Sequence, residues 1–171
     1  MAVCDRGYGR ALRGIRRPDL DRRGSAGGAL AGGVIVRLRD ARQAVPAGLV
    51  AVYPAMHPNG QQPDELFAAD DPFRYVPLNY AGSVEALRDP VAFPGMGSMQ
   101  GFPRSFVVVC ENDFLRPSVE RFVTQLQDAG VPVERWFEPD AMHGHLNDPS
   151  HPEAVRTLAG LAEWIGAGSD R

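Results

Sequence analysis

The sequence predicts an α/β fold with a mostly parallel sheet and helices on both of its faces. Short apolar runs, which are typical of buried strands, alternate with patterns that repeat every three or four residues, which are typical of amphipathic helices. From Ser25 the expected order is helix, strand, long loop, strand, helix, strand, helix. Strands that alternate with helices favour parallel pairing, because each helix carries the chain back across the sheet.

The first helix is expected directly after Ser25, where small and apolar residues could pack closely against a sheet. The helix is rich in alanine and glycine and includes Ala29, Leu30, Gly33, Val34 and Leu38. Arg39, Asp40 and Arg42 mark its polar end. Residues 47–54, AGLVAVYP, form a short apolar run that a proline ends, which indicates a buried strand.

Two further strands and two further helices follow in the carboxyl half. Residues 105–113, SFVVVCEND, and residues 131–140, VPVERWFEPD, predict strands. The helix between them is expected to bury Val119, Phe122, Val123 and Leu126 and to end at Gly130. The last helix is expected to begin near Ser150 and Pro152 and to bury Val155, Leu158, Ala162 and Ile165.

The chain divides into regions of different character. Residues 1–24 contain seven arginines, are interrupted by glycine and proline, and predict no regular structure. Residues 25–171 carry the strand and helix patterns of one domain. Within that domain, residues 55–105 lack a clear period and predict a lid or loop insertion with short helices.

Composition excludes several classes of function. The 171 residues have a formal net charge of −3, too small to favour a nucleic-acid or acidic-membrane partner. No apolar stretch is long enough for a membrane span. Cys4 and Cys110 do not make a disulfide framework, so we expect a cytoplasmic protein. All 18 basic residues are arginines, which excludes a phosphate-binding P-loop because that motif needs a lysine.

Ser25 lies in the Gly-rich stretch RRGSAGGALAGG, residues 22–33, which is typical of a turn that exposes a nucleophilic serine at the start of a helix. In such a turn the backbone N–H of the next residue, Ala26, can donate to a developing oxyanion. The same letters also fit an ordinary turn. The serine therefore needs a base, and the base needs an acid that orients it.

Asp113 and His143 are the expected acid and base. Asp113 stands where the second predicted strand ends, and His143 follows the third in the loop EPDAMHGH. The order Ser, Asp, His along the chain matches the order of such triads in folds of this type. His145 stays open as an alternative base, and Asp113 could instead cap the following turn.

The remaining polar residues are expected to have structural and not catalytic roles. Asp140 is expected to serve a turn, Glu111 at most to support Asp113, and Cys110 to fill the core as a small apolar residue. His57 and His151 are expected at the surface or in loops. His143 and His145 are too few ligands for a metal site, so neither a metal nor an organic cofactor is expected.

Four stretches, SAGGALAGG, VYP, CENDFLRPSVERFVTQLQDAGVPVE and EPDAMHG, resemble the carboxyl half of α/β-hydrolases of the hormone-sensitive-lipase-like group. The resemblance runs from about Gly24 to Ile165. It implies a nucleophile at Ser25, an orienting acid at Asp113 and a general base at His143. It also implies hydrolysis of carboxylic esters, often with short acyl chains, without a cofactor.

Residues 1–24 depart from that pattern. They do not resemble the family's amino half, which supplies its first strands and a further loop of oxyanion donors, so we expect a partial hydrolase fold whose amino-terminal strands are missing. Arg23 stands where the serine turn favours glycine, and RRPDLDRR predicts no strand leading into that turn. Truncation or a shift of reading frame before Gly24 would explain these departures together.

The leading hypothesis is therefore an esterase or lipase-like enzyme acting on a small-molecule ester, with Ser25, Asp113 and His143 as its triad and Ala26 as an oxyanion donor. The alternative is a catalytically inactive hydrolase fragment that acts only by association, in keeping with a possible homo-oligomer. A nucleotide-binding domain is poorly supported, because GYGRAL at residues 7–12 lacks the third glycine and a preceding strand.

Overall fold

The structure is a computed structural model that describes residues 20–58 and 75–168. The Arg-rich segment lies mostly outside the described residues, and so does part of the 55–105 insertion. All the strands and helices expected from residue 25 onward fall inside them.

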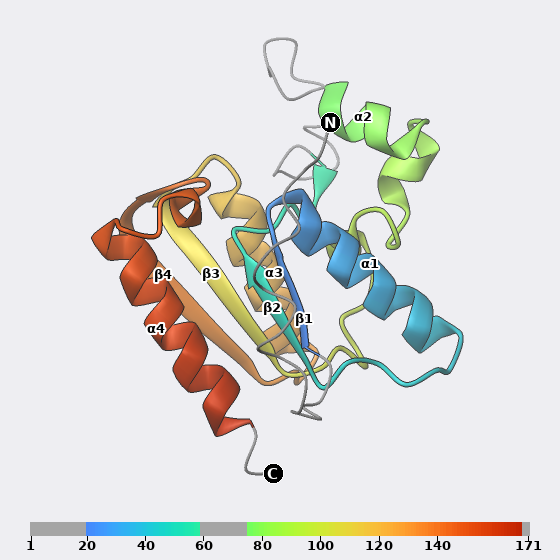
Figure 1. The fold of residues 1–171 in the computed structure, drawn as a ribbon. Helices are drawn as coiled ribbons and strands as arrows, with labels where there is room; N and C mark the ends of the chain where they lie inside the picture. The colour runs from blue at the N-terminus through green and yellow to red at the C-terminus, as the bar shows by residue number, and fades with distance from the viewer. Residues whose placement is uncertain (1–19, 59–74, 169–171) are drawn as a thin grey trace, which may run out of the picture.

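The described chain forms a four-stranded parallel sheet, with its strands in the spatial order β1-β2-β3-β4 (Figure 1). The strands are β1 (Leu20–Gly24), β2 (Gly48–Val52), β3 (Ser105–Asn112) and β4 (Val133–Met142). β3 pairs with a strand on each side, and its first six residues are buried. The predicted α/β class with a parallel sheet is confirmed.

β1 corrects one expectation, because the sequence predicts no strand leading into the Ser25 turn. Residues 20–24 pair in parallel with β2 in continuous register, with Arg23 opposite Ala51 and Gly24 opposite Val52. Backbone groups make these pairings, so an edge strand can form without the apolar run that a central strand requires. The strand could not be predicted from LDRRG because this charged stretch contains no apolar run.

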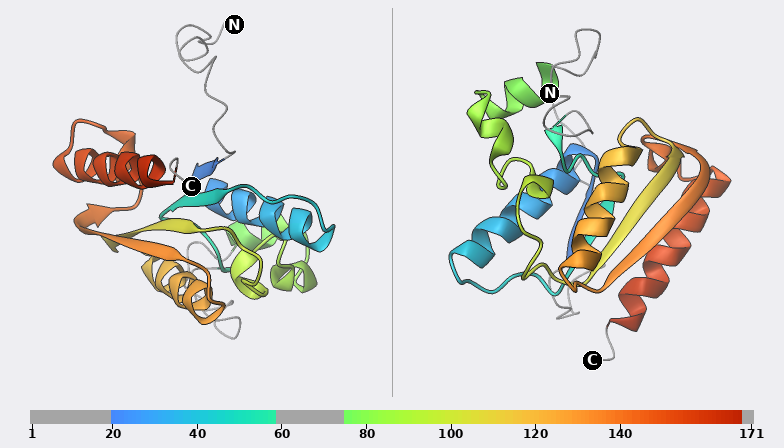
Figure 2. Two further views of the ribbon diagram at one scale, coloured as in Figure 1. Left: turned by 90° about the horizontal axis from the view of Figure 1, so that it is seen from below. Right: turned by 180° about the vertical axis from the view of Figure 1, so that it is seen from behind.

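Helices cover the two faces of the sheet unequally (Figure 2). α1 (Ala26–Asp40) and α3 (Arg116–Asp128) pack on one face through a large apolar core. α4 (Pro152–Ala167) covers the opposite face through a smaller core with Trp164. Buried residues of β2 and β3 point alternately into the two cores, as the pleat of a strand requires.

α4 buries a different side from the one that its sequence predicts. Val155 and Leu158 are 53% and 43% exposed, Ala162 is exposed, and Ile165 is only partly buried. The buried residues of the helix are Ala154, Thr157, Gly160 and Trp164. The helix turns Thr157 and Gly160 toward the sheet, and Thr157 there forms hydrogen bonds with His145 and Glu138.

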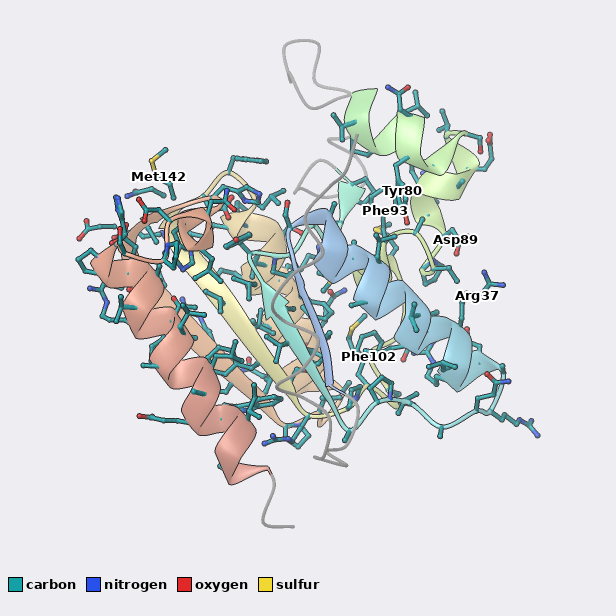
Figure 3. The ribbon with its side chains drawn as sticks, viewed as in Figure 1. Arg37, Tyr80, Asp89, Phe93, Phe102 and Met142 are labelled. Atoms are coloured by element: carbon teal, nitrogen blue, oxygen red, sulfur yellow. The ribbon has the colours of Figure 1, made fainter. Side chains whose placement is uncertain are left out.

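The described part of the 55–105 insertion folds into short helices beside α1. These are α2 (Tyr75–Ala81), η3 (Glu85–Arg88) and η4 (Pro94–Met96). The ring of Tyr80 packs edge-on against Phe93 at 5.8 Å between centroids, and Figure 3 shows the pair between α2 and the segment before η4. A role for this insertion as a lid stays a prediction.

Candidate active site

Ser25 occupies a tight turn between β1 and α1. Its backbone adopts φ 53° and ψ −126°, a sparsely populated conformation that only a well-supported turn can hold. The Ser25 N–H donates to the carbonyl of Val52 at 3.0 Å, while its own carbonyl accepts from the N–H groups of Gly28 at 3.0 Å and Ala55 at 3.1 Å. The strained serine is thus fixed by three backbone hydrogen bonds.

A close contact with Tyr53 favours a residue without a Cβ directly before Ser25. A Cβ on Gly24 would lie 3.2 Å from Cε2 of Tyr53, tighter than ordinary van der Waals contact. Ala26 follows as the first residue of α1, and the N–H groups of a first helical turn have no partner within the helix. The Ala26 N–H is therefore available to a group bound beside Ser25.

Asp113 follows directly after β3, and its side chain is 1% exposed. Oδ1 accepts the N–H of Leu115 at 2.8 Å, and Oδ2 accepts from Nδ1 of His143 at 2.9 Å. The two alternatives for this residue are therefore compatible, since one carboxylate oxygen holds the turn and the other holds the imidazole.

His143 follows β4 and lies between the other two residues in the chain of hydrogen bonds. Its Nε2 is 2.9 Å from Oγ of Ser25. Because a carboxylate only accepts, the Nδ1–H of His143 donates to Asp113, and in the neutral ring Nε2 is then free to accept from Ser25. The geometry suits removal of the serine proton by His143.

Two aromatic rings that the sequence did not identify as part of the site contact His143. The ring centroids of Tyr53 and Phe114 lie 4.9 Å and 5.0 Å from that of the imidazole. Tyr53 is buried, with φ 40°, and burial is the main cause that raises its pKa. Their places in the sequence could have indicated this contact, because Tyr53 directly follows β2 and Phe114 directly follows Asp113.

Exposed apolar side chains flank the same site. Phe114 is 53% exposed and Met142, immediately before His143, is 68% exposed. Figure 3 shows Met142 pointing outward at the carboxyl end of the sheet. Such a surface beside His143 suits an apolar ligand better than a charged one.

The other residues considered from the sequence take part less directly. The ring nitrogens of His145 lie within hydrogen-bond distance of Cys110 and Thr157, while it is His143 that reaches Ser25. Glu111 accepts the backbone N–H of Asp140 at 2.9 Å, so both residues shape the turn near Asp113. The contacts of Glu111 and Asp140 agree with the roles expected for them, whereas His145 does not reach Ser25 as the alternative base would.

His57 lies in the loop after β2, one of its two expected places, but it is buried and not at the surface. It is 1% exposed, with Nδ1 2.8 Å from Oγ of Ser118 and Nε2 3.2 Å from Oε1 of Gln125. Burial, and next the positive charge of Arg121, lower its pKa to about 4. His151, in contrast, is exposed as expected.

Residues 20–58 and 75–168 contain neither a metal-binding cluster nor a membrane-spanning helix. No three histidine, cysteine or carboxylate side chains there gather as ligands for a metal ion. Over the same described stretches, none of the helices has the length and apolar character needed to cross a membrane.

The sequence matches the model of a known family. The family described as alpha/beta hydrolase fold matches residues 24–147, which include Ser25, Asp113 and His143. Among curated proteins, rabbit (Oryctolagus cuniculus) arylacetamide deacetylase is 33% identical over 67 residues, covering 39% of this chain and 17% of that protein.

Solved structures of esterases have the same fold. Carboxyl esterase 2 of the mycorrhizal fungus Tuber melanosporum superposes with a TM-score of 0.74 at 23% identity, covering 85% of this chain and 52% of that one. An esterase of Pyrobaculum calidifontis gives 0.73 at 23% identity, covering 84% and 50%. The chain therefore spans about half the length of these esterases, and a much smaller part of the curated relative.

Proposed function

Because the chain belongs to the alpha/beta hydrolase fold family, in its hormone-sensitive-lipase-like group, we propose that it is a serine-dependent carboxylic ester hydrolase. Ser25 is the nucleophile, His143 the general base and Asp113 the residue that orients the imidazole. The observation that carries this assignment is the continuous chain of hydrogen bonds, 2.9 Å from Ser25 to His143 and 2.9 Å from His143 to Asp113.

The reaction proceeds in two steps. Nε2 of His143 takes the hydroxyl proton while Oγ of Ser25 attacks the ester carbonyl, and the Ala26 N–H donates to the oxyanion. Protonated His143 then gives its proton to the leaving alcohol, which leaves an acyl group on Ser25. Water activated by His143 attacks this acyl-enzyme and releases the acid.

The substrate is a small ester with an apolar group that contacts the surface beside His143. Exposed Phe114 and Met142 supply apolar surface beside His143. The mechanism needs no metal or organic cofactor, because the triad provides both the nucleophile and the proton transfers.

Hydrolysis of p-nitrophenyl butyrate by the purified protein tests the proposal. Ser25→Ala is expected to lower kcat by about 10⁶-fold, as removal of a serine nucleophile does elsewhere. Ser150→Ala, a substitution at an exposed serine before α4, is the control and keeps the wild-type rate. Equal rates for wild type and Ser25→Ala would contradict the assignment.

The role of Asp113 has its own test. Asp113→Asn leaves the shape of the site but disturbs the His143 tautomer, so kcat is expected to fall on the order of 10⁴-fold. Asp140→Asn is a matched control, because Asp140 is exposed and asparagine also tolerates its left-handed backbone at φ 59°. A loss under tenfold for Asp113→Asn would remove its proposed role.

The alternative, an inactive hydrolase that acts only by association, has one specific observation in its favour. Leu30 and Val34 lie one turn apart on α1 and are 53% and 47% exposed, which places apolar side chains side by side in solvent. A wild-type protein that forms dimers through this pair, becomes monomeric as Leu30→Ser, and hydrolyses no ester would favour it.

A further inference from the structure

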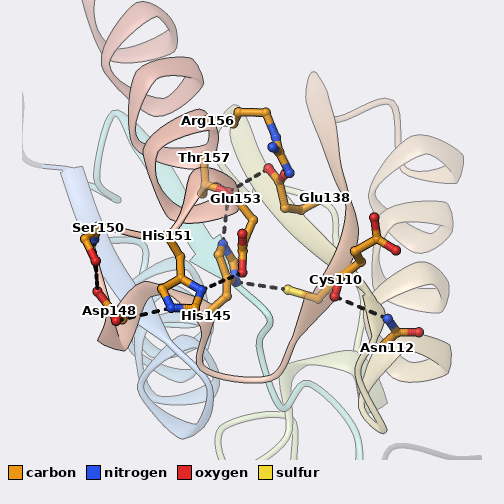
Figure 4. A network of polar contacts seen from close by, with 11 residues as sticks. Cys110, Asn112, Glu138, His145, Asp148, Ser150, His151, Glu153, Arg156 and Thr157 are labelled. Carbon is orange, nitrogen blue, oxygen red and sulfur yellow. Dashed lines mark hydrogen bonds and ion pairs between the residues drawn. The ribbon is translucent and has the colours of Figure 1, made fainter.

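A buried polar network lies beneath the turn that bears His143, on the face of the sheet that α4 covers (Figure 4). Its centre is His145, two residues after His143 and first in the short helix η5 (His145–Asn147). Gly144, between the two histidines, has a left-handed φ of 80° that turns the chain sharply. His145 therefore points into the molecule although His143 faces Ser25.

His145 connects this turn to two separate elements. Nδ1 is 3.3 Å from Sγ of Cys110 on β3, and Nε2 is 3.0 Å from Oγ1 of Thr157 on α4. All three residues are buried, Thr157 completely. The turn is thus attached to the central strand on one side and to the covering helix on the other.

The direction of each hydrogen bond follows from Glu138, whose side chain is 1% exposed. It accepts from Nε1 of Trp136 at 2.9 Å, from Nε of Arg156 at 2.7 Å and from Oγ1 of Thr157 at 3.0 Å. The proton of Thr157 is therefore committed to the carboxylate.

Because the Thr157 proton is committed, its oxygen must accept from His145, so Nε2 of His145 carries the hydrogen. Nδ1 is then the acceptor, and the Cys110 thiol donates to it. Burial, the main cause, raises the pKa of Cys110 to about 12, which agrees with a thiol that keeps its proton. The pair is thus a hydrogen-bonded contact and not a cysteine nucleophile with its base.

Tyr53 joins the two histidines. Its ring lies 4.9 Å from His143 and 5.5 Å from His145, between centroids. A shift of His145 would therefore be transmitted to His143 both through the backbone of Gly144 and through the contacts of this ring.

We propose that His145 is a positioning residue for the proposed hydrolysis: by bonding to Cys110 and Thr157 it holds the turn that places His143 between Ser25 and Asp113. The inference rests on the proposed function for its kinetic consequence but not for the geometry. A displacement of about 1 Å at a reacting group can cost 10²-fold in rate, so the anchor matters even though it touches no substrate.

His145→Phe tests the proposal, because it keeps a ring against Tyr53 but removes both hydrogen bonds. We expect kcat for p-nitrophenyl butyrate to fall about 10–100-fold with KM within about twofold of wild type. His145→Gln, whose amide can still donate to Thr157, should recover most of the loss. His57→Phe is the matched control, since it removes two hydrogen bonds from a buried histidine held by α3, and kcat should stay within about twofold of wild type.

A second readout does not require activity. In ¹⁵N-histidine-labelled protein, the Nδ1–H of His143 is protected from exchange by its hydrogen bond to Asp113. His145→Phe should speed that exchange at least tenfold, a loss of about 1.4 kcal/mol of protection, whereas His57→Phe should not.

The outcomes separate the two proposals. A wild type without esterase activity would contradict the proposed function, and the exchange of the His143 proton would then decide the role of His145. A folded His145→Phe with wild-type kcat and unchanged His143 exchange would overturn the positioning role. If His145→Phe does not fold, Thr157→Val removes the bond from His145 to α4 at nearly constant shape and is read by the same two measurements.

Discussion

The two faces of the sheet are built differently. α1 and α3 cover one face with an almost entirely apolar core, in which Phe122, Ile35 and Leu126 are fully buried. On the other face α4 packs alone, over a core that contains the buried carboxylate of Glu138 and the polar side chains of His145 and Thr157. The first face gains stability chiefly from area removed from water, and the second also depends on fixed hydrogen bonds.

We therefore expect the two faces to support different properties, fold stability on one face and the geometry of the proposed site on the other. The apolar face holds the sheet together and tolerates changes that preserve volume. The polar face holds the turn of His143 in one place, since each hydrogen bond there has a fixed direction. Substitutions on the first face should therefore act on the free energy of unfolding, whereas some on the second should act on kcat.

The largest effect on stability is expected for Phe122→Ala on the apolar face. Phe122 is fully buried at the contact between α3 and the sheet, so its truncation leaves a cavity and should cost about 3–5 kcal/mol of unfolding free energy. Urea denaturation measures it. Gln127→Ala, at an exposed position of the same helix, should change stability by less than about 0.5 kcal/mol.

The next effect depends on pH and also arises on the apolar face. His57 has a pKa of about 4 in the folded protein and about 6.5 when unfolded, so between these values only the unfolded chain gains a proton. The contribution of neutral His57 is present above pH 6.5 and is lost as pH falls toward 4, by roughly 3 kcal/mol in all.

Urea denaturation of wild type and His57→Gln at pH 7 and pH 4.5 isolates this contribution. Wild type should lose more stability than the variant over that interval, because other acidic groups titrate in both proteins alike. The same pH dependence in the two proteins would contradict the assignment.

A pair of glycines in α4 tests the packing of the polar face. A Cβ on Gly160 would lie 2.3 Å from the ring of Trp136, whose N–H is held by Glu138. Gly160→Ala should therefore destabilise the fold by about 1–3 kcal/mol. Gly166→Ala meets no atom within 4 Å and should stabilise it by about 0.5 kcal/mol, so thermal unfolding should move in opposite directions.

The smallest effect is expected for the apolar side chains that α4 exposes. Val155→Ser and Leu158→Ser each replace a side chain that is about half in solvent, and each should change the unfolding free energy by less than about 0.5 kcal/mol. A loss above about 2 kcal/mol at either position would mean that this side of α4 is covered in solution.

The same contrast explains what the sequence could predict. The period of Val119, Phe122, Val123 and Leu126 correctly identified the buried side of α3, because these four side chains pack in the apolar core. The equivalent pattern in α4 chose the wrong side. Thr157 is buried through its bonds to Glu138 and His145, and those partners lie far from it in the chain, so no local pattern reveals the pairing.

The candidate site was more accessible to sequence reasoning than its surroundings. Ser25, Asp113 and His143 follow β1, β3 and β4, and the carboxyl ends of parallel strands meet at one edge of the sheet. The sequence did not predict the contacts of Tyr53 with the two histidine rings or the burial of His57, because both depend on residues far away in the chain. β1 was missed because its charged sequence contains no apolar run, while strand pairing is made by backbone groups.

The hydrogen bonds of the Ser25 backbone have a consequence for how this turn can vary. Its N–H donates to Val52 of β2, and its carbonyl accepts from Gly28 of α1 and from Ala55, so all three bonds are made by backbone groups. These bonds therefore set no requirement for the side chain at position 23, whereas Gly24 is restricted by its close contact with Tyr53. An arginine at position 23 is therefore compatible with this turn, because the hydrogen bonds that hold the turn are made by backbone groups.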